Sequence, residues 1–273
     1  MLYYKALARQ FLLISCLILN IAYVQAQSQS ETDAALGALK SMKPEQVEMM
    51  LKMAMNTLPP NKRSDLEDAL KLMKATRPET QAIEWKHKSI IFVPIAHAST
   101  PEFYNGVKSV VSNYKAKGYT VFYEQITRAA KKEETAGKPD TLALKFRKLV
   151  GLEPTRQTYA ILKNFFPGIV AQPEYKDLGI TASDLNADIS LEQLVGKYED
   201  LYGPVALNNC DFETKTGVLG YNCGALGNDI EPVILDYRNE NVARLVKSAA
   251  TYKILVIYGA KHIPGIIKLL SED

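Results

Sequence analysis

Three residues of this sequence, His97, Glu124 and His262, are of the types that bind divalent metals or transfer protons, and each lies at or just past the end of an apolar run. The runs are "SIIFVPIAH", "YTVFYEQI" and "YKILVIYGA". Two neutral imidazoles and a carboxylate form an open ligand set for a divalent ion, with positions left for water. Without a metal, the same set could work as general base and general acid. We expect the third histidine of the chain, His87, to be solvated.

The elements around these residues predict that they meet at one edge of a sheet. The run 89–97 is typical of a strand buried on both faces, a helix is predicted over 100–118, and 119–126 is a second strand. Strand, helix and strand at this spacing form a βαβ unit, so we expect the two strands to be parallel neighbours. The carboxyl ends of parallel strands share one edge, so a third parallel strand at 252–260 would bring all three residues together.

Each of the three residues also has an interpretation without a function. His97 could cap the helix that begins at Thr100, Glu124 could pair with Arg128 one turn later, and His262 could be exposed. The chain has no G-x-S-x-G, H-E-x-x-H, P-loop or C-x-x-C motif. A serine nucleophile paired in space with a histidine stays an alternative, because such triads are not sequential.

The rest of the pattern predicts an α/β protein with a mainly parallel sheet, flanking helices and a helical N-terminal segment. Apolar residues at helical spacing predict two short helices within 27–80, joined by a Pro-Pro turn, and 81–273 is expected to form the α/β domain. The region 138–203 is typical of helices and turns, the Gly- and Asn-rich stretch 207–229 of a loop, and 238–250 of a helix.

Residues 1–26 have the pattern of a cleaved signal peptide. Lys5 and Arg9 precede the apolar run 11–24, and small residues precede a cleavage site after Ala26. The run has about 14 residues, fewer than the roughly 20 that a spanning helix needs, although an uncleaved membrane anchor is the alternative. Cleavage would lower the net charge from +3 to +1, which argues against a nucleic-acid partner. We therefore expect a secreted or periplasmic protein.

The cysteines agree with export. Removal of Cys16 with the signal peptide leaves the pair Cys210 and Cys223, which we expect to be bridged in an oxidising compartment. Such a bridge would stabilise the fold by roughly 3 kcal/mol. The alternatives are two free thiols or half of a metal site. A zinc site made of four cysteines is excluded.

Two stretches carry a resemblance to a known family. The stretch 95–127, "IAHASTPEFYNGVKSVVSNYKAKGYTVFYEQIT", resembles the opening of the TraB/PrgY/Tiki superfamily, which has a strand ending in G-x-x-H, a helix, and a strand ending in glutamate. The stretch 237–270 resembles the family's carboxyl-terminal signature, an Arg-Asn helix start followed by a strand and a second G-x-x-H. Asp188, in "DLNADIS", resembles an acidic position of the middle region. The resemblance spans 88–270 and is dense only at its two ends.

One motif departs from the family pattern. Gly259 to His262 fits G-x-x-H, whereas the first motif runs from Pro94 to His97, with proline where the family has glycine. Proline there stiffens the strand end and removes an N–H group.

The resemblance implies a TraB-like α/β domain with a site of two histidines and one glutamate. His97, Glu124 and His262 would hold a divalent metal ion or activate water. Arg238 would orient the carboxylate or stabilise developing negative charge, and Asp188 is a weaker candidate.

The function most favoured is an exported metal-dependent hydrolase that acts on peptide bonds of a peptide or protein substrate. The family includes membrane-associated proteases, so the resemblance also leaves open association with a membrane surface. The alternative is a non-catalytic protein that binds a peptide or haem in the same cleft. A third hypothesis is a relative with a decayed site, for which Pro94 is the indication. The sequence does not indicate the oligomeric state.

Overall fold

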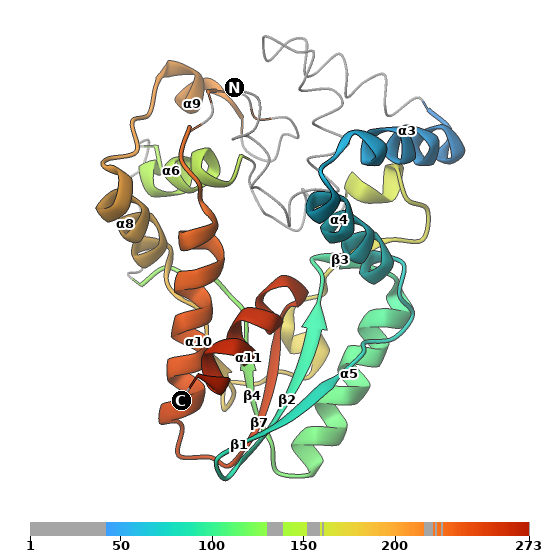
Figure 1. Ribbon diagram of the computed structural model, residues 1–273, viewed down its shortest axis with the longest axis vertical. Coiled ribbons are helices and arrows are strands. Elements are labelled where there is room, and N and C mark those ends of the chain that lie inside the picture. The colour runs from blue at the N-terminus through green and yellow to red at the C-terminus, as the bar shows by residue number, and fades with distance from the viewer. Residues whose placement is uncertain are drawn as a thin grey trace. The chain divides into compact units, whose positions relative to one another are not determined.

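The computed structural model describes residues 42–129, 139–151, 159, 161–215, 221, 223–224 and 226–272. They belong to two compact units, each assembled from segments that are distant in the sequence (Figure 1). Unit 1 comprises Met1–Lys71, Lys132–Ala171 and Val195–Ile230, and unit 2 comprises Leu72–Lys131, Gln172–Leu194 and Glu231–Asp273. The predicted signal peptide lies outside the described residues, and the predicted division of the chain into an N-terminal segment 27–80 and a domain 81–273 stays a prediction.

Unit 2 is built on a five-stranded sheet in the order β1-β2-β7-β4-β6. Only β1 is antiparallel to its neighbour, and the other pairs are parallel. The predicted α/β class with a mainly parallel sheet is therefore confirmed. The strands of this unit are β1 (Gln81–Trp85), β2 (Lys88–Ile95), β3 (Ala98–Ser99), β4 (Thr120–Tyr123), β6 (Leu185–Asn186) and β7 (Lys253–Gly259).

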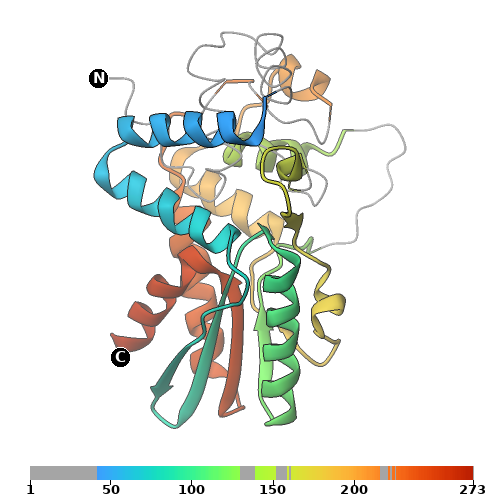
Figure 2. The ribbon, with the colours of Figure 1, turned by 90° about the vertical axis from the view of Figure 1, so that its right-hand side faces the viewer.

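Helices cover both faces of this sheet (Figures 1 and 2). Successive side chains of β2 and β7 point to opposite faces, so each strand contributes to two apolar clusters. One cluster packs the sheet against α10 and α11, and the other packs it against α5. The helical elements are α5 (Pro101–Ala116), the 3₁₀ turns η4 (Tyr175–Leu178) and η6 (Ala260–His262), the π-helical turn η5 (Pro232–Asp236), α10 (Tyr237–Ser248) and α11 (Ile263–Ser271).

The βαβ unit β2-α5-β4 forms where it was predicted. Thr100 caps α5, because its Oγ1 accepts a hydrogen bond from the Phe103 N–H at 3.1 Å. Gly118 follows the helix with a φ of +83°, a conformation that glycine adopts without strain. The interpretation of His97 as the helix cap is therefore wrong.

The prediction that β2 and β4 are neighbours is also wrong, since β7 lies between them. β2 pairs with β7 from Ser89↔Lys253 to Ile95↔Gly259, and β4 pairs with the other side of β7. β7 is apolar and buried from Ile254 onward, so it needs a covered position with a neighbour on each side. The crossover through α5 is long enough to leave room for this third strand.

Unit 1 is mainly helical. The two helices predicted in its first segment are present, although α4 begins at Pro60 and not near Ser64. Arg63 of α4 donates from Nε to the Met55 carbonyl at 3.0 Å, which satisfies an acceptor in the last turn of α3. The elements are α3 (Pro44–Thr57), α4 (Pro60–Met73, ending in unit 2), α6 (Thr141–Val150), η3 (Ile161–Asn164), β5 (Val170–Ala171), α8 (Leu191–Tyr202, beginning in unit 2) and α9 (Asn209–Glu213).

The predicted disulfide between Cys210 and Cys223 is confirmed, with Cα atoms 5.4 Å apart. It ties the short helix α9 to the stretch that follows it, within a region that the sequence predicted to be loop throughout. In the part of the chain that the structure describes, no helix is long and apolar enough to cross a membrane.

Candidate functional site

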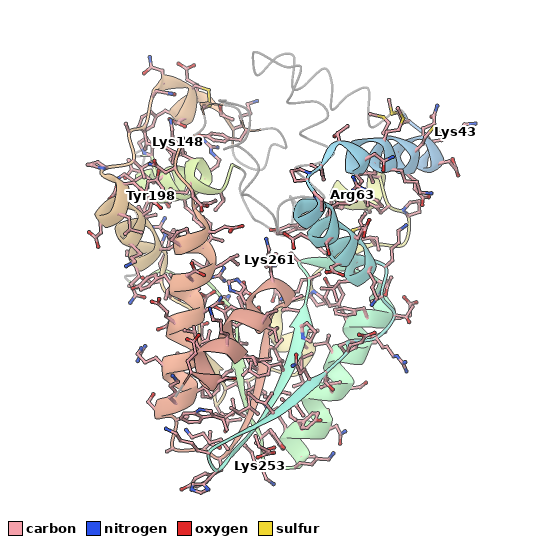
Figure 3. The ribbon with its side chains drawn as sticks, in the orientation of Figure 1. Lys43, Arg63, Lys148, Tyr198, Lys253 and Lys261 are labelled. Atoms are coloured by element: carbon pink, nitrogen blue, oxygen red, sulfur yellow. A yellow bond between two sulfur atoms is a disulfide. The ribbon has the colours of Figure 1, made fainter. Side chains whose placement is uncertain are left out.

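Four of the predicted residues meet beyond the carboxyl ends of three parallel strands. Glu124 follows β4 directly, Asp188 follows β6, and His262 follows β7, while Arg238 lies in the first turn of α10. Figure 3 labels Lys253 at the start of β7 and Lys261 past its other end, which marks this edge of the sheet. The side chains of all four residues are at most 7% exposed.

Arg238 holds the group together. Its Nε donates to Asp188 Oδ1 at 2.9 Å, and its Nη2 donates to Asp188 Oδ2 at 2.7 Å and to Glu124 Oε1 at 2.5 Å. Its Nη1 lies 3.1 Å from His262 Nε2 and donates to the Ile234 carbonyl at 3.3 Å. A guanidinium has five N–H groups, and these contacts occupy all of them. Burial alone would lower the pKa of Arg238, but the neighbouring Tyr258 and the carboxylates of Asp188 and Glu124 raise it well above the usual value.

The glycine at the end of β7 makes room for the carboxylate. Gly259 donates its N–H to Glu124 Oε2 at 2.5 Å. A Cβ atom at this position would lie 3.0 Å from Glu124 Oε2 and 3.3 Å from His262 Cδ2. The glycine of the second G-x-x-H therefore serves close approach of the backbone to the site.

His262 is a neutral imidazole with a defined tautomer. Because a guanidinium can only donate, His262 Nε2 accepts from Arg238, and Nδ1 carries the proton that it donates to Asn239 Oδ1 at 2.7 Å. Burial and then the positive charge of Arg238 lower the pKa of His262 well below its usual value. Gly265 leaves space for Asn239, since a Cβ atom there would lie 2.4 Å from Asn239 Nδ2.

His97 belongs to the same group and differs from His262 in its exposure, because it is only half-buried. Burial is the largest cause that lowers the pKa of His97, and the negative charge of Glu124 acts in the opposite direction. The Gln172 N–H donates to the His97 carbonyl at 2.8 Å, which fixes the chain after β2. The imidazole of His97 is therefore neutral near pH 7.

Three residues of the site were not predicted as site residues: Asn239, Gln172 and Tyr175. Asn239 could have been found, because it is the second residue of the Arg-Asn helix start. Gln172 and Tyr175 lie outside the apolar runs, so no periodicity pointed to them. The Tyr175 hydroxyl donates to the main-chain carbonyl of Glu124, and burial raises the pKa of Tyr175. The remaining histidine, His87, is exposed in the turn between β1 and β2.

The side chains do not fit a divalent metal in this arrangement. Both Glu124 oxygens, both Asp188 oxygens and both His262 nitrogens already have hydrogen-bond partners. The guanidinium of Arg238 adds a positive charge where a cation would have to bind. Among the residues described, no group of three or more His, Cys, Asp or Glu side chains could hold a metal ion.

Comparisons of the chain with family models, with curated proteins and with solved structures find no match. The resemblance to the TraB/PrgY/Tiki superfamily therefore rests on the residues at its two ends and stays a prediction.

Proposed function

We propose that the protein is an exported hydrolase that acts on peptide bonds at the carboxyl edge of the unit 2 sheet. The observation that carries this proposal is the convergence of Glu124, Asp188 and His262 on one buried guanidinium, with the half-buried imidazole of His97 in the same electrostatic environment. Ionisable groups with shifted pKa values that gather at one sheet edge are typical of catalytic sites.

His97 is the general base in this proposal. A general base needs to be unprotonated and accessible to water, and His97 combines a neutral ring with partial exposure. His262 is 5% exposed and uses both ring nitrogens, which suits a positioning role. In the reaction, His97 would take a proton from water as the oxygen attacks the carbonyl carbon, and return it to the leaving amine.

Arg238 has a positioning role in this proposal. Of the two roles expected for it, its contacts favour orientation of the Glu124 carboxylate, since its N–H groups are already engaged with protein acceptors. It would hold Glu124 beside His97, where the negative charge stabilises the imidazolium that forms during proton transfer.

The engagement of all five N–H groups of Arg238 also favours the alternative function, a binding protein without catalysis. With its five N–H groups engaged, Arg238 offers no donor to a developing oxyanion without rearrangement. A peptide-binding protein without catalysis would need no such donor. A haem-binding protein would need an imidazole for the iron, and His97 is the more exposed of the two site histidines. Its holoprotein would have a Soret band.

The divalent ion implied by the family resemblance is a separate proposal. It requires Arg238 to release Glu124 Oε1 and His262 Nε2, which would free donor atoms. Metal analysis of protein purified without chelator tests it. A stoichiometric metal together with loss of cleavage after chelation would support the ion, and full activity of metal-free protein would exclude it.

Export is supported by the disulfide, because such bonds persist in oxidising compartments. N-terminal sequencing of mature protein should begin at Gln27. A mature chain that retains residues 1–26 in a reducing compartment would contradict export.

A peptide-library assay tests the hydrolase. We expect the wild-type protein and the control variant His87→Ala, which changes an exposed histidine outside the site, to cleave the same peptides. His97→Ala should lose at least about 100-fold in kcat/KM, as is usual when a general base is removed. Peptides that bind to the wild type without cleavage would support the binding alternative. Equal cleavage by His97→Ala and the wild type would contradict the proposed role of His97.

A further inference from the structure

Gln172 carries a buried acceptor that has no partner. The residue is 9% exposed, and in the described part of the chain its Oε1 accepts no hydrogen bond. Buried polar atoms in folded proteins are nearly always paired, so this exception calls for an explanation. Two other buried polar atoms also lack partners. Tyr258 Oη belongs to a residue of the apolar core, and Arg147 Nε belongs to a guanidinium whose other nitrogens donate to carbonyls.

Tyr258 also borders the candidate site, because its ring centroid lies 4.9 Å from that of His262, whereas Gln172 is the one of these three residues that contacts His97. Its N–H donates to the His97 carbonyl at 2.8 Å, so its position is tied to the segment that carries His97. Its carboxamide lies beside the His97 ring and the Tyr175 hydroxyl. The single proton of Tyr175 is donated to the Glu124 carbonyl, so the Tyr175 oxygen can only accept from Gln172. The NH₂ end of the carboxamide suits that oxygen, which leaves Oε1 for another donor.

We propose that Gln172 Oε1 accepts a hydrogen bond from a substrate N–H next to the bond that is hydrolysed. The inference rests on the proposed function and adds a requirement to it: the substrate must carry an amide N–H next to the cleaved peptide bond, because an ester at that position has no N–H to offer. A site with a buried acceptor selects against an analogue that lacks the matching donor, since the acceptor is then left unpaired.

Depsipeptides test this contact directly. Each analogue of a cleaved peptide carries an ester in place of one amide next to the cleaved bond, and each is assayed with the wild type, with Gln172→Met and with the exposed-residue control Gln81→Met. We expect Gln172→Met to lower kcat/KM for the peptide about 10- to 100-fold, the loss typical of one buried hydrogen bond. For one depsipeptide, kcat/KM with the wild type should be lower than for the peptide by the same factor. For that depsipeptide, Gln172→Met should cause no further loss. Equal losses for the peptide and every depsipeptide would overturn the proposal.

A binding measurement separates this inference from the proposed function, because it needs neither cleavage nor a variant that folds. N-methylacetamide, which has one N–H, and N,N-dimethylacetamide, which has none, are titrated into ¹⁵N-labelled wild-type protein. We expect N-methylacetamide alone to shift the side-chain NH₂ signals of Gln172. If both amides shift these signals equally, or neither does, the acceptor role of Gln172 is overturned even where peptide cleavage is observed. If no peptide is cleaved but the expected shift appears, the hydrolase fails and the amide-binding role of Gln172 stands.

Discussion

Unit 1 and unit 2 each bury a carboxylate against a basic side chain. In unit 1, Lys148 Nζ of α6 lies 2.6 Å from Asp211 Oδ2. Asp211 also accepts hydrogen bonds from the Tyr221 hydroxyl and, at 2.7 Å, from the Asn208 N–H. Burial raises the pKa of the Asp211 carboxyl, but the hydrogen bonds from Lys148, Tyr221 and Asn208 outweigh burial and hold it below the usual value.

In unit 2, two carboxylates share one guanidinium. The group also contains the neutral imidazole of His262 and lies at an edge where three strands end, next to the half-buried His97 and the unpaired oxygen of Gln172. The Lys148–Asp211 pair comes from helices and a disulfide-bridged segment, whereas all three histidines of the chain belong to unit 2. The comparison teaches that a buried ion pair alone does not identify a site. Lowered imidazole pKa values and an unused acceptor are what distinguish unit 2.

The largest expected effect is on Arg238. Arg238→Leu leaves two buried carboxylates without their cation, so the free energy of unfolding should fall by about 3–5 kcal/mol. Lys148→Leu should cost less, about 2–3 kcal/mol, because Asp211 keeps its other hydrogen bonds. Urea denaturation measures both. The exposed control Lys268→Leu should change stability by less than about 0.5 kcal/mol. Equal losses for Arg238→Leu and Lys148→Leu would remove this difference between the units.

The second largest effect is expected for the disulfide, which lies in unit 1. Cys210→Ser with Cys223→Ser should lower the free energy of unfolding by roughly 3 kcal/mol, since the closed loop is short. Limited proteolysis of this variant should cut first within 207–229, because the bridge restrains that segment. Amide hydrogen exchange in β2 and β7 should match the wild type. Faster exchange in β7 than in 207–229 would show that the bridge supports unit 2 instead.

Two glycines test how closely the unit 2 site is packed. Gly265→Ala should displace Asn239 from His262, and Gly259→Ala should displace Glu124, each at a cost of about 1–3 kcal/mol. Gly196→Ala in α8 is the matched control, because nothing lies within 4 Å of its Cβ position. It should be neutral or stabilise by up to about 1 kcal/mol. Thermal unfolding measures all three, and a neutral Gly265→Ala would contradict the close approach of Asn239.

The smallest effect is the pH dependence. His97 and His262 have lowered pKa values in the folded protein, so the unfolded chain binds more protons below about pH 6.5 and stability falls on acidification. The loss of unfolding free energy should reach at most about 1.4 kcal/mol per pH unit for each histidine. Above about pH 6.5 the two histidines should contribute little further change. His262→Asn should reduce this slope and exposed His87→Asn should not. Asp211 in unit 1, whose pKa is also lowered, should contribute only near pH 4 and below. A slope that His262→Asn leaves unchanged would contradict this assignment.

The first half of the sheet could be predicted because its signals are local. The apolar run before His97, the cap at Thr100 and the stop at Gly118 each act within a few residues. The edge on which Glu124 and His262 meet also followed from the parallel topology. The insertion of β7 between β2 and β4 could not be read in the same way, because strand order is decided by contacts between segments distant in the sequence.

The unpredicted site residues have a similar cause. Gln172 and Tyr175 contribute through a main-chain hydrogen bond to His97 and a hydroxyl contact to the Glu124 carbonyl, neither of which leaves a pattern in the sequence. The hydrogen bond from Arg238 to His262 Nε2 could not be predicted from the sequence either. The residue types that suggested metal ligation remain, but a cation of the protein itself lies among them.

The order of strands along the chain has a consequence for biosynthesis. β7, at the centre of the sheet, is the last of the sheet strands to leave the ribosome, where chains emerge N-terminus first at about 5–20 residues per second. Until then β2 and β4 have no strand between them, and the segment that carries His262 does not yet exist. The nascent chain therefore cannot close its sheet or assemble its site before β7 and the segment that carries His262 have emerged.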